Sequence, residues 1–320
     1  MTNGEELRSA VPSGRATIQE AAPAKINLFL HIGVRGADGF HPLQSLVVFT
    51  GMGDELALAV APDLSLTVDG PFARELTGEG DNLVLRAARA LGALSLASSG
   101  AALSLTKNLP VASGIGGGSS DGAAALRGLR RLWDADITDA RLQEIAADLG
   151  SDIPVCVEAR SAFMEGRGER LRPVGAMPRI AMLLVNPKVA VSTRDVFAAL
   201  QSRSGIDMQL PLEGFRDTAD LLRFLETTHN DLEAPAREIQ PVIGEVLGAM
   251  AGLPGALFTR MSGSGATCFG IFADDGCCRR AAQILQEARP GWWVAPTFVP
   301  QSGIAPEAPG REIGPTPDGL

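Results

Sequence analysis

A glycine-rich stretch in the middle of the chain, residues 110–124, constrains the fold more than any other segment. Four of the five residues 114–118 are glycine, and the fifth is Ile115. Ser119, Ser120 and Asp121 follow before an alanine-rich helical pattern. Glycine tolerates positive φ and lets another group approach the backbone, while Ser and Asp favour the N-cap of a helix. Such a turn presents free N–H groups and the positive end of a helix dipole to an anion, so the stretch predicts a phosphate site.

The alternative is a flexible linker. Apolar segments flank the stretch on both sides, which favours the phosphate site. The common phosphate motifs are absent, because no Gly-x-x-x-x-Gly-Lys-Ser/Thr occurs and Ser119 stands where Gly-x-Gly-x-x-Gly needs glycine. No His-Arg-Asp or Asp-Phe-Gly occurs either, which argues against a protein kinase.

Composition narrows the class of protein further. A chain of 320 residues has room for two domains, and a net charge of −9 argues against non-specific nucleic-acid binding. No apolar run is long enough for a transmembrane helix, and residues 1–20 lack a signal-peptide pattern, so we expect a cytoplasmic protein without a membrane partner. Four cysteines without Cys-x-x-Cys spacing predict free thiols and no structural zinc.

Strands and helices mix along the chain without a regular βαβ rhythm, which predicts an α+β fold of two domains. We expect a mobile tail over residues 1–20, domains over 21–176 and 177–300, and a disordered tail over 301–320. Alternating or continuous apolar residues predict strands at 24–32, 45–50, 55–60, 64–68, 102–105, 180–185, 256–261, 267–272 and 292–299. Periodic apolar residues predict helices at 82–91, 123–133, 139–149, 192–200, 221–225, 276–288 and, after a cap at 230–233, up to 250.

Several polar residues have two interpretations at this stage. Lys25 and Asn27 share one face of the first strand, which is either a solvated edge or the wall of a site. Phe40 and His41 lie in a glycine-rich loop, where they are either ordinary loop residues or a stacking site. Asp152 stands between a helix-ending glycine and an apolar run, where it is either a turn or cap residue or a functional carboxylate.

Taken together, five segments resemble the ordered motifs of the GHMP small-molecule kinases. They are Pro-Ala-Lys-Ile-Asn-Leu-Phe-Leu at 23–30, Arg-Gly-Ala-Asp-Gly-Phe-His at 35–41, the stretch at 110–124, Gly-Ser-Asp-Ile-Pro at 150–154 and Ser-Gly-Ser-Gly-Ala at 262–266. The resemblance covers about residues 22–300. It implies an N-terminal ATP-binding domain of ribosomal S5-like topology, a ferredoxin-like C-terminal domain, and a site in the cleft between them.

The first two motifs narrow the resemblance to a member that uses ATP and Mg²⁺ to phosphorylate the 2-hydroxyl of a cytidine diphosphate-linked methylerythritol, in isoprenoid biosynthesis. The resemblance implies Lys25 and Asp152 as the catalytic pair, with Asp152 as base and Lys25 as its charged partner. It implies the substrate contacts Asn27, Phe40, His41 and Thr193. The implied ATP contacts are Asn82, Lys107, Pro110, Val111, Ala112, Ser113, Gly114, Ile115, Gly116, Gly117, Gly118, Ser119 and Ser120, and no metal ligand is identified.

One position departs from the family pattern, because Phe40 stands where tyrosine is frequent; the ring can still stack, but no hydroxyl can donate a hydrogen bond. Three other functions remain as alternatives. The first is a mevalonate- or homoserine-type kinase of the same family. The others are a nucleotide-binding module without catalysis and, from the S5-like topology alone, an RNA-binding protein, which the acidic balance disfavours.

Overall fold

The computed structural model describes residues 17–37, 39–76, 82–94, 100–200, 206 and 208–301. The predicted tails over 1–20 and 301–320 fall almost wholly outside these residues. Strand β1 (Thr17–Ile32) starts earlier than expected, because its first residues pair with the far end of β2 (Leu43–Ala61). Residues 17–20 are therefore part of the sheet and not of a tail.

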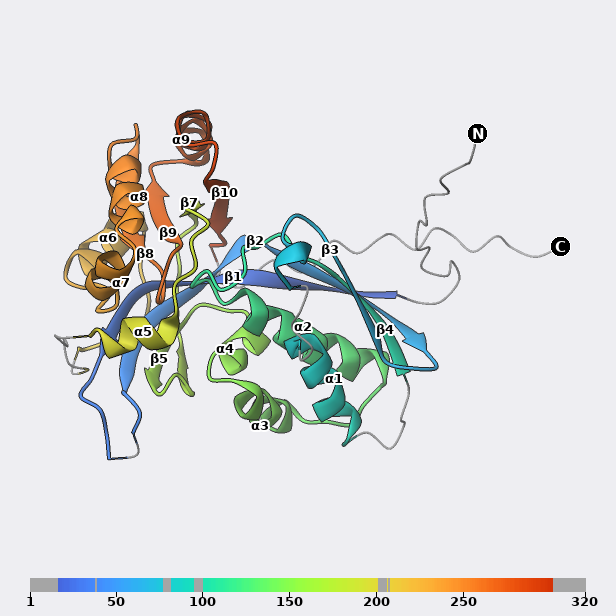
Figure 1. Cartoon of the computed structure of the whole chain (residues 1–320). Coiled ribbons are helices and arrows are strands. Elements are labelled where there is room, and N and C mark those ends of the chain that lie inside the picture. The colour runs from blue at the N-terminus through green and yellow to red at the C-terminus, as the bar shows by residue number, and fades with distance from the viewer. Residues whose placement is uncertain are drawn as a thin grey trace, which may run out of the picture.

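The N-terminal half contains one mixed sheet (Figure 1). In the described residues its order is β3-β4-β2-β5-β6, and β1 pairs with β2. All pairs are antiparallel except β3 with β4, which are parallel. The remaining strands are β3 (Ser65–Asp69), β4 (Gly100–Thr106), β5 (Ala162–Gly166) and β6 (Arg170–Pro173).

Helices cover one face of this sheet, below it in Figure 1. Apolar residues of β2 and β4 pack there against the helices in a buried core. The glycine stretch enters this layer directly, because α2 starts at Gly117 and not at the predicted residue 123. The elements are the short 3-10 helix η1 (Ala73–Leu76) and the helices α1 (Leu83–Gly92), α2 (Gly117–Leu132), α3 (Asp139–Leu149) and α4 (Ile153–Glu158).

The C-terminal half contains a four-stranded antiparallel sheet of order β10-β7-β9-β8 in the described residues. This order and the helices between the strands are those of a ferredoxin-like domain. The predicted α+β arrangement of two domains is thereby confirmed. The strands are β7 (Ile180–Asn186), β8 (Ala256–Met261), β9 (Cys268–Phe272) and β10 (Trp293–Val299), and the helices are α5 (Thr193–Ala198), α6 (Thr218–Glu226), α7 (Glu233–Ile239), α8 (Val242–Ala251) and α9 (Asp275–Ala288).

A separate apolar core joins the two sheets. It combines Ile26 and Phe29 of β1 with Met182 of β7 and Phe269 of β9, all of them fully buried. The guanidinium of Arg260 adds polar links, because it donates to the carbonyl of Leu28 at 2.8 Å and to two carbonyls near the end of α6. The first strand is thus held by both halves of the molecule.

Three details differ from the sequence prediction. Strand β2 is continuous where two strands were expected, because its two halves pair with different partners, β4 and β5. The predicted helix up to residue 250 is divided into α7 and α8 at Gln240, which precedes Pro241 and adopts φ −132 and ψ 86. The alternation of β1 is interrupted by a bulge between Asn27 and Phe29, which places Phe29 in the core between the sheets.

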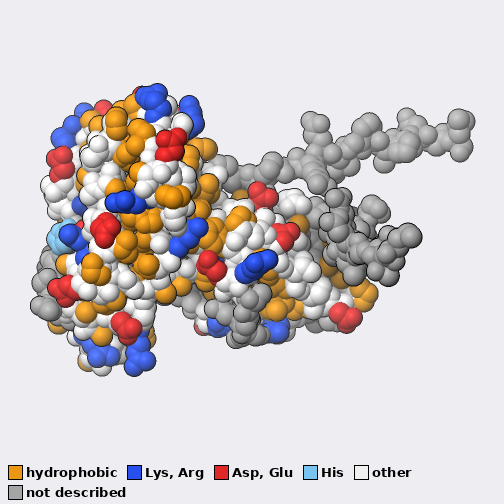
Figure 2. All heavy atoms as spheres, turned by 45° about the horizontal axis from the view of Figure 1, so that its top comes forward, with side chains coloured by type: hydrophobic (Ala, Val, Ile, Leu, Met, Phe, Trp, Pro, Cys, Tyr) orange, Lys and Arg blue, Asp and Glu red, His pale blue; other side chains and the backbone are white. Residues whose placement is uncertain are grey.

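The surface carries charges of both signs. On the face shown in Figure 2, acidic and basic side chains are interspersed among apolar ones over the described residues. None of the helices in the described part of the chain has the length and apolar composition needed to cross a membrane.

Candidate active site

The sequence-predicted residues gather around one large cavity of about 1270 Å³. Its lining comes from both halves of the chain, from Lys25 in β1 to Ser264 after β8. Only two of the predicted residues are absent from the lining. Ile115 is buried in the core between the sheets, and the hydroxyl of Ser120 donates to the carbonyl of Pro23 at 2.7 Å.

The glycine stretch forms one wall of the cavity and has the geometry of an anion site. Gly116 adopts φ 64 at the N-cap of α2, and Gly117 and Gly118 begin the helix without a side-chain cap. The first N–H groups of α2 have no intrahelical acceptor, because of their place in the helix. The loop is therefore able to bind a phosphate through its backbone.

A second glycine-rich turn, residues 262–265, holds this loop in place. At Gly114, which has φ 76, a Cβ would lie 2.6 Å from the carbonyl oxygen of Ser262 and 2.7 Å from that of Gly265. The hydroxyl of Ser262 donates to the carbonyl of Gly114 at 3.0 Å and accepts the backbone N–H of Asn27 at 3.1 Å. Only glycine permits this close packing of two backbones.

Lys25 and Asp152 meet at the cavity wall. Nζ of Lys25 lies 2.7 Å from Oδ2 of Asp152; the lysine side chain is 4% exposed and the aspartate side chain 41%. The stem of Lys25 runs along the glycine loop, because a Cβ at Gly116 would lie 3.2 Å from its Cε. Asp152 occupies the N-cap position of α4, but its side chain makes no capping hydrogen bond there.

The buried thiol of Cys156 interacts electrostatically with both members of this pair. Cys156 lies behind it, and burial raises the pKa of the Cys156 thiol to about 11. The thiol is therefore neutral at physiological pH and offers no competing base or nucleophile. The carboxylate of Asp152 is the acidic group that faces both Lys25 and the cavity.

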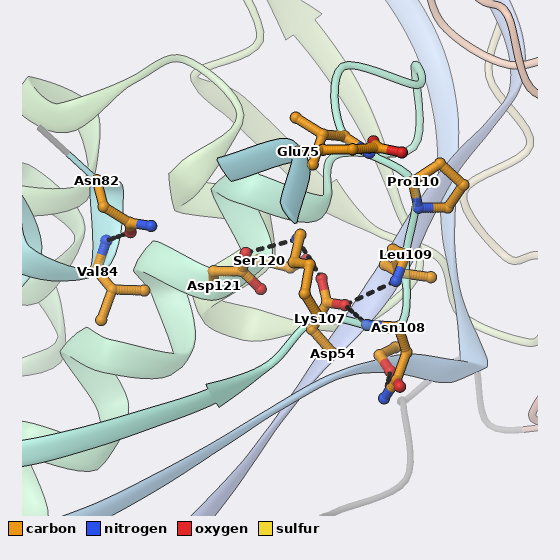
Figure 3. Close-up of polar contacts among 12 residues, drawn as sticks. Asp54, Glu75, Asn82, Val84, Lys107, Asn108, Leu109, Pro110, Ser120 and Asp121 are labelled. Atoms are coloured by element: carbon orange, nitrogen blue, oxygen red, sulfur yellow. Dashed lines mark hydrogen bonds and ion pairs between the residues drawn. The ribbon is translucent and has the colours of Figure 1, made fainter. Parts of the chain in front are cut away.

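Asn82 and Lys107 lie on the α1 side of the loop (Figure 3). Asn82 caps α1, since its Oδ1 accepts the N–H of Val84 at 2.8 Å. Lys107 is 2% exposed, and its ammonium contacts Asp54 and Asp121. Both residues line the cavity, although Lys107 already has two carboxylate partners.

The remaining predicted residues line the other end of the cavity. Phe40 is 54% exposed, and the guanidinium of Arg167 lies 4.2 Å from the centre of its ring. His41 Nδ1 lies 3.1 Å from the carbonyl oxygen of Gly33. The hydroxyls of Thr193 and Ser264 lie 2.8 Å apart.

Asn27 is buried in the same wall, where its side-chain amide donates to Ser45 at 2.8 Å. Together with the burial of Lys25, this decides between the two interpretations of the first strand. The polar face of β1 lines the wall of the cavity and is not a solvated edge.

Sequence reasoning missed several lining residues. Phe197 places its ring 6.0 Å from that of His41, and Arg35 and Arg167 add two cations to the cavity. Phe197 carried a weak signal, because it follows Thr193 by one helical turn on α5. Arg167 lies in the β5–β6 turn, which the pattern identified only as a turn. Asp54, which contacts Lys107 but does not line the cavity, carried no local signal at all.

Comparisons with known proteins agree with this geometry. A model of the GHMP kinases N terminal domain matches residues 82–160, and one of the GHMP kinases C terminal domain matches residues 211–289. A 4-diphosphocytidyl-2-C-methyl-D-erythritol kinase of Parvibaculum lavamentivorans is 50% identical over 281 residues, which are 87% of this chain and 96% of the relative. The chain belongs to the 4-diphosphocytidyl-2-C-methyl-D-erythritol kinase family. It is therefore an enzyme, a GHMP kinase, and the family implies ATP as phosphoryl donor.

Other members of this kinase family give the same result. A relative of Rhodospirillum rubrum with the same name is 46% identical over 90% of this chain and 94% of its own length. A crystal structure of 4-(cytidine 5'-diphospho)-2C-methyl-D-erythritol kinase superposes with a TM-score of 0.74 at 33% identity, over 88% of this chain and 100% of that chain. A homoserine kinase of Cytophaga hutchinsonii reaches a TM-score of 0.67 at 19% identity, over 92% of this chain and 98% of its own, which shows a shared fold alone.

Proposed function

We propose that this enzyme transfers the γ-phosphoryl group of ATP to the 2-hydroxyl of 4-diphosphocytidyl-2-C-methyl-D-erythritol, in the methylerythritol phosphate route to isoprenoids. The observation that carries the proposal is the Lys25–Asp152 ion pair, which lines the same cavity as the phosphate loop and the Phe40–His41 loop. ATP bound at one end of the cavity and the acceptor alcohol bound at the other end would meet at this ion pair.

The loop suits the triphosphate of ATP. Gly118 is exposed to the cavity, and a Cβ there would meet only Leu83 within 4 Å, so the backbone is open to a ligand. Mg²⁺ would accompany ATP and would neutralise part of the charge on its phosphates. In the part of the chain that the structure describes, no three metal-binding side chains gather, so the phosphate oxygens would supply most of its ligands.

Asp152 would act as the base. Its carboxylate accepts the proton of the 2-hydroxyl while that oxygen bonds to the γ-phosphorus and the bond from phosphorus to the bridging oxygen of ADP breaks. The ammonium of Lys25, 2.7 Å away, stabilises the carboxylate and the negative charge on the transferred group. Phosphoryl transfer needs alignment and charge stabilisation, and this pair supplies both.

The other end of the cavity suits a cytosine. Phe40 offers a stacking face, and Asn27 and Thr193 offer polar groups nearby. Because the carbonyl of Gly33 can only accept, Nδ1 of His41 must carry the proton of their hydrogen bond, which leaves Nε2 as an acceptor. The amino group of cytosine can donate to Nε2, whereas uracil presents a carbonyl oxygen at the same position.

A coupled assay of ADP formation tests the proposal. The acceptors are the cytidylylated substrate, the unmodified methylerythritol phosphate, mevalonate and homoserine. We expect turnover with the cytidylylated substrate and little with the other three. Faster turnover of mevalonate or homoserine would assign the chain to another GHMP activity, and no turnover of any acceptor would leave only a nucleotide-binding module.

A further inference from the structure

A buried cluster of three charged side chains lies directly beneath the phosphate loop (Figure 3). The ammonium of Lys107 lies 2.7 Å from Oδ2 of Asp121 and is also bonded to Oδ2 of Asp54. None of the three side chains is more than 4% exposed. Taking such charges out of water is costly, and replacing a buried ion pair by apolar residues is often neutral for stability. The cluster therefore calls for an explanation other than stability.

The cluster connects the two ends of the loop. Oδ1 of Asp54 accepts the backbone N–H groups of Asn108 at 2.6 Å and Leu109 at 2.8 Å, immediately before the loop begins. Asp121 lies in the first turns of α2, immediately after the loop. Since Lys107 contacts both carboxylates, one ammonium sets the distance between the entry and the exit of the loop.

The same ammonium also supports the middle of the phosphate site from below. A Cβ at Gly117 would lie 3.2 Å from Nζ of Lys107 and 3.6 Å from Oδ2 of Asp54. A shift of the lysine would therefore move the backbone at the start of α2, where the N–H groups that bind phosphate are located.

We infer that Lys107 is a positioning residue for the phosphate loop, acting with Asp54 and Asp121, and that it does not recognise the adenine of ATP. The inference rests on the proposed use of this loop for ATP. Family resemblance places Lys107 near the adenine, but two of its three N–H donors are directed at carboxylates.

Burial in this cluster perturbs the carboxyl of Asp121. Burial raises the pKa of Asp121 above its ordinary range, and the neighbouring Asp54 acts in the same direction. Oδ1 of Asp121 has no hydrogen-bond partner in the described structure. The charged groups that face Asp121 are Lys107 from β4 and Asp54 from β2, while α1 presents the apolar Leu83 to the same part of α2.

The test compares a ligand that carries a nucleobase with one that does not. Binding of MgATP and of base-free magnesium tripolyphosphate is measured by calorimetry for the parent, for Lys107→Met, and for Lys107→Met combined with Asp121→Asn. The double variant removes one of the two carboxylates that Lys107→Met leaves unpaired, so we expect it to be more stable than the single variant. We expect both ligands to bind at least tenfold more weakly and by the same factor, while the KM of the acceptor stays unchanged.

Two further variants serve as references. Asp121→Asn keeps an oxygen that can accept from Lys107, so we expect it to weaken ATP binding less than Lys107→Met does. Arg127→Met removes a cation from the same helix, where it pairs with Glu20 away from the loop, and should lower the melting temperature without changing affinity.

Two results would overturn the inference. A loss of affinity for ATP with unchanged affinity for tripolyphosphate would show that Lys107 contacts the adenine. A folded double variant that binds both ligands like the parent would make the cluster dispensable. Because binding is measured without an acceptor, either result is independent of the identity of the phosphorylated alcohol.

Discussion

Adding a methyl group at Gly118 tests directly whether the start of α2 binds the triphosphate. Gly118 is exposed to the cavity, has no positive φ, and offers a new Cβ only one neighbour within 4 Å, Leu83 Cδ1 at 3.6 Å. Gly118→Ala is therefore free of clashes. Replacing a helical glycine by alanine stabilises a helix by roughly 0.5–1 kcal/mol, so the variant should melt at or above the temperature of the parent.

The effect on ATP should have the opposite sign. A phosphate oxygen must come within about 2.9 Å of a backbone nitrogen to form a hydrogen bond, and a methyl group on the same residue obstructs that approach. Losing one hydrogen bond to a charged group costs about 1.5–3 kcal/mol. This corresponds to a dissociation constant about 10- to 150-fold higher, and Gly118→Val should lie at the upper end.

The other glycines of the loop would respond differently to a new side chain. Gly114→Ala would place a Cβ against two backbone carbonyls and must destabilise the whole fold. At Gly117 a Cβ would lie 3.2 Å from the ammonium of Lys107, so Gly117→Val would disturb the charged cluster as well as the phosphate. Only Gly118 separates binding from stability.

Calorimetry with MgATP and thermal unfolding measure the two effects in the same samples. Gly122→Ala is the matched control: it lies one turn later on α2, and its Cβ would make only ordinary contacts with Leu83 and Ile153. It should leave ATP affinity unchanged. Stable Gly118 variants that bind ATP as tightly as the parent would refute the backbone phosphate site.

Three further predictions concern the other parts of the site and the core. Asp152→Asn should lower kcat by a factor of roughly 10²–10⁴ in steady-state assays, while calorimetry shows nearly parental ATP affinity. A kcat within about threefold of the parent would exclude Asp152 as the general base. His41→Ala should narrow the preference for the cytidine over the uridine substrate in kcat/KM, whereas Phe40→Ala should weaken both alike; equal parental use of both substrates would contradict this. Burial lowers the pKa of His31 to about 4, so the unfolded chain binds a proton that the folded chain does not, and stability should fall as pH falls from about 6.5 to about 4. The glutamine of His31→Gln cannot bind this proton. The melting temperature of this variant should therefore change less across that pH range than the melting temperature of the parent.

Elements with strong local signals could be predicted from the sequence. Helix α3 was predicted with its observed bounds, because Thr138 caps it through its side chain and Gly150 ends it. The break between α7 and α8 was missed although Pro241 marks it, because the apolar pattern continues across the proline. Strand β2 was predicted as two strands, 45–50 and 55–60, whereas pairing with β1 on either side of residues 50–52 makes it one continuous strand.

The sequence identified some polar residues in and around the cavity and missed others. Lys25 and Asp152 could be named only through the family resemblance, because their own segments left each with two interpretations. Burial of Lys25 and the direction of its ammonium come from contacts between segments more than a hundred residues apart. Asp54 was missed altogether, since its place at the end of the loop depends on the pairing of β2 with β4.

Ser262 shows why such a site depends on tertiary structure. Its hydroxyl donates to the carbonyl of Gly114 in the glycine-rich loop and accepts the backbone N–H of Asn27 in β1. A third segment therefore fixes the two ends of the cavity relative to each other. Phosphoryl transfer requires the donor and the acceptor oxygen to be aligned, and a small misplacement is costly for the rate. We therefore propose that the C-terminal domain contributes to catalysis less by contacting the reacting atoms than by holding β1 and the glycine loop in fixed positions relative to each other.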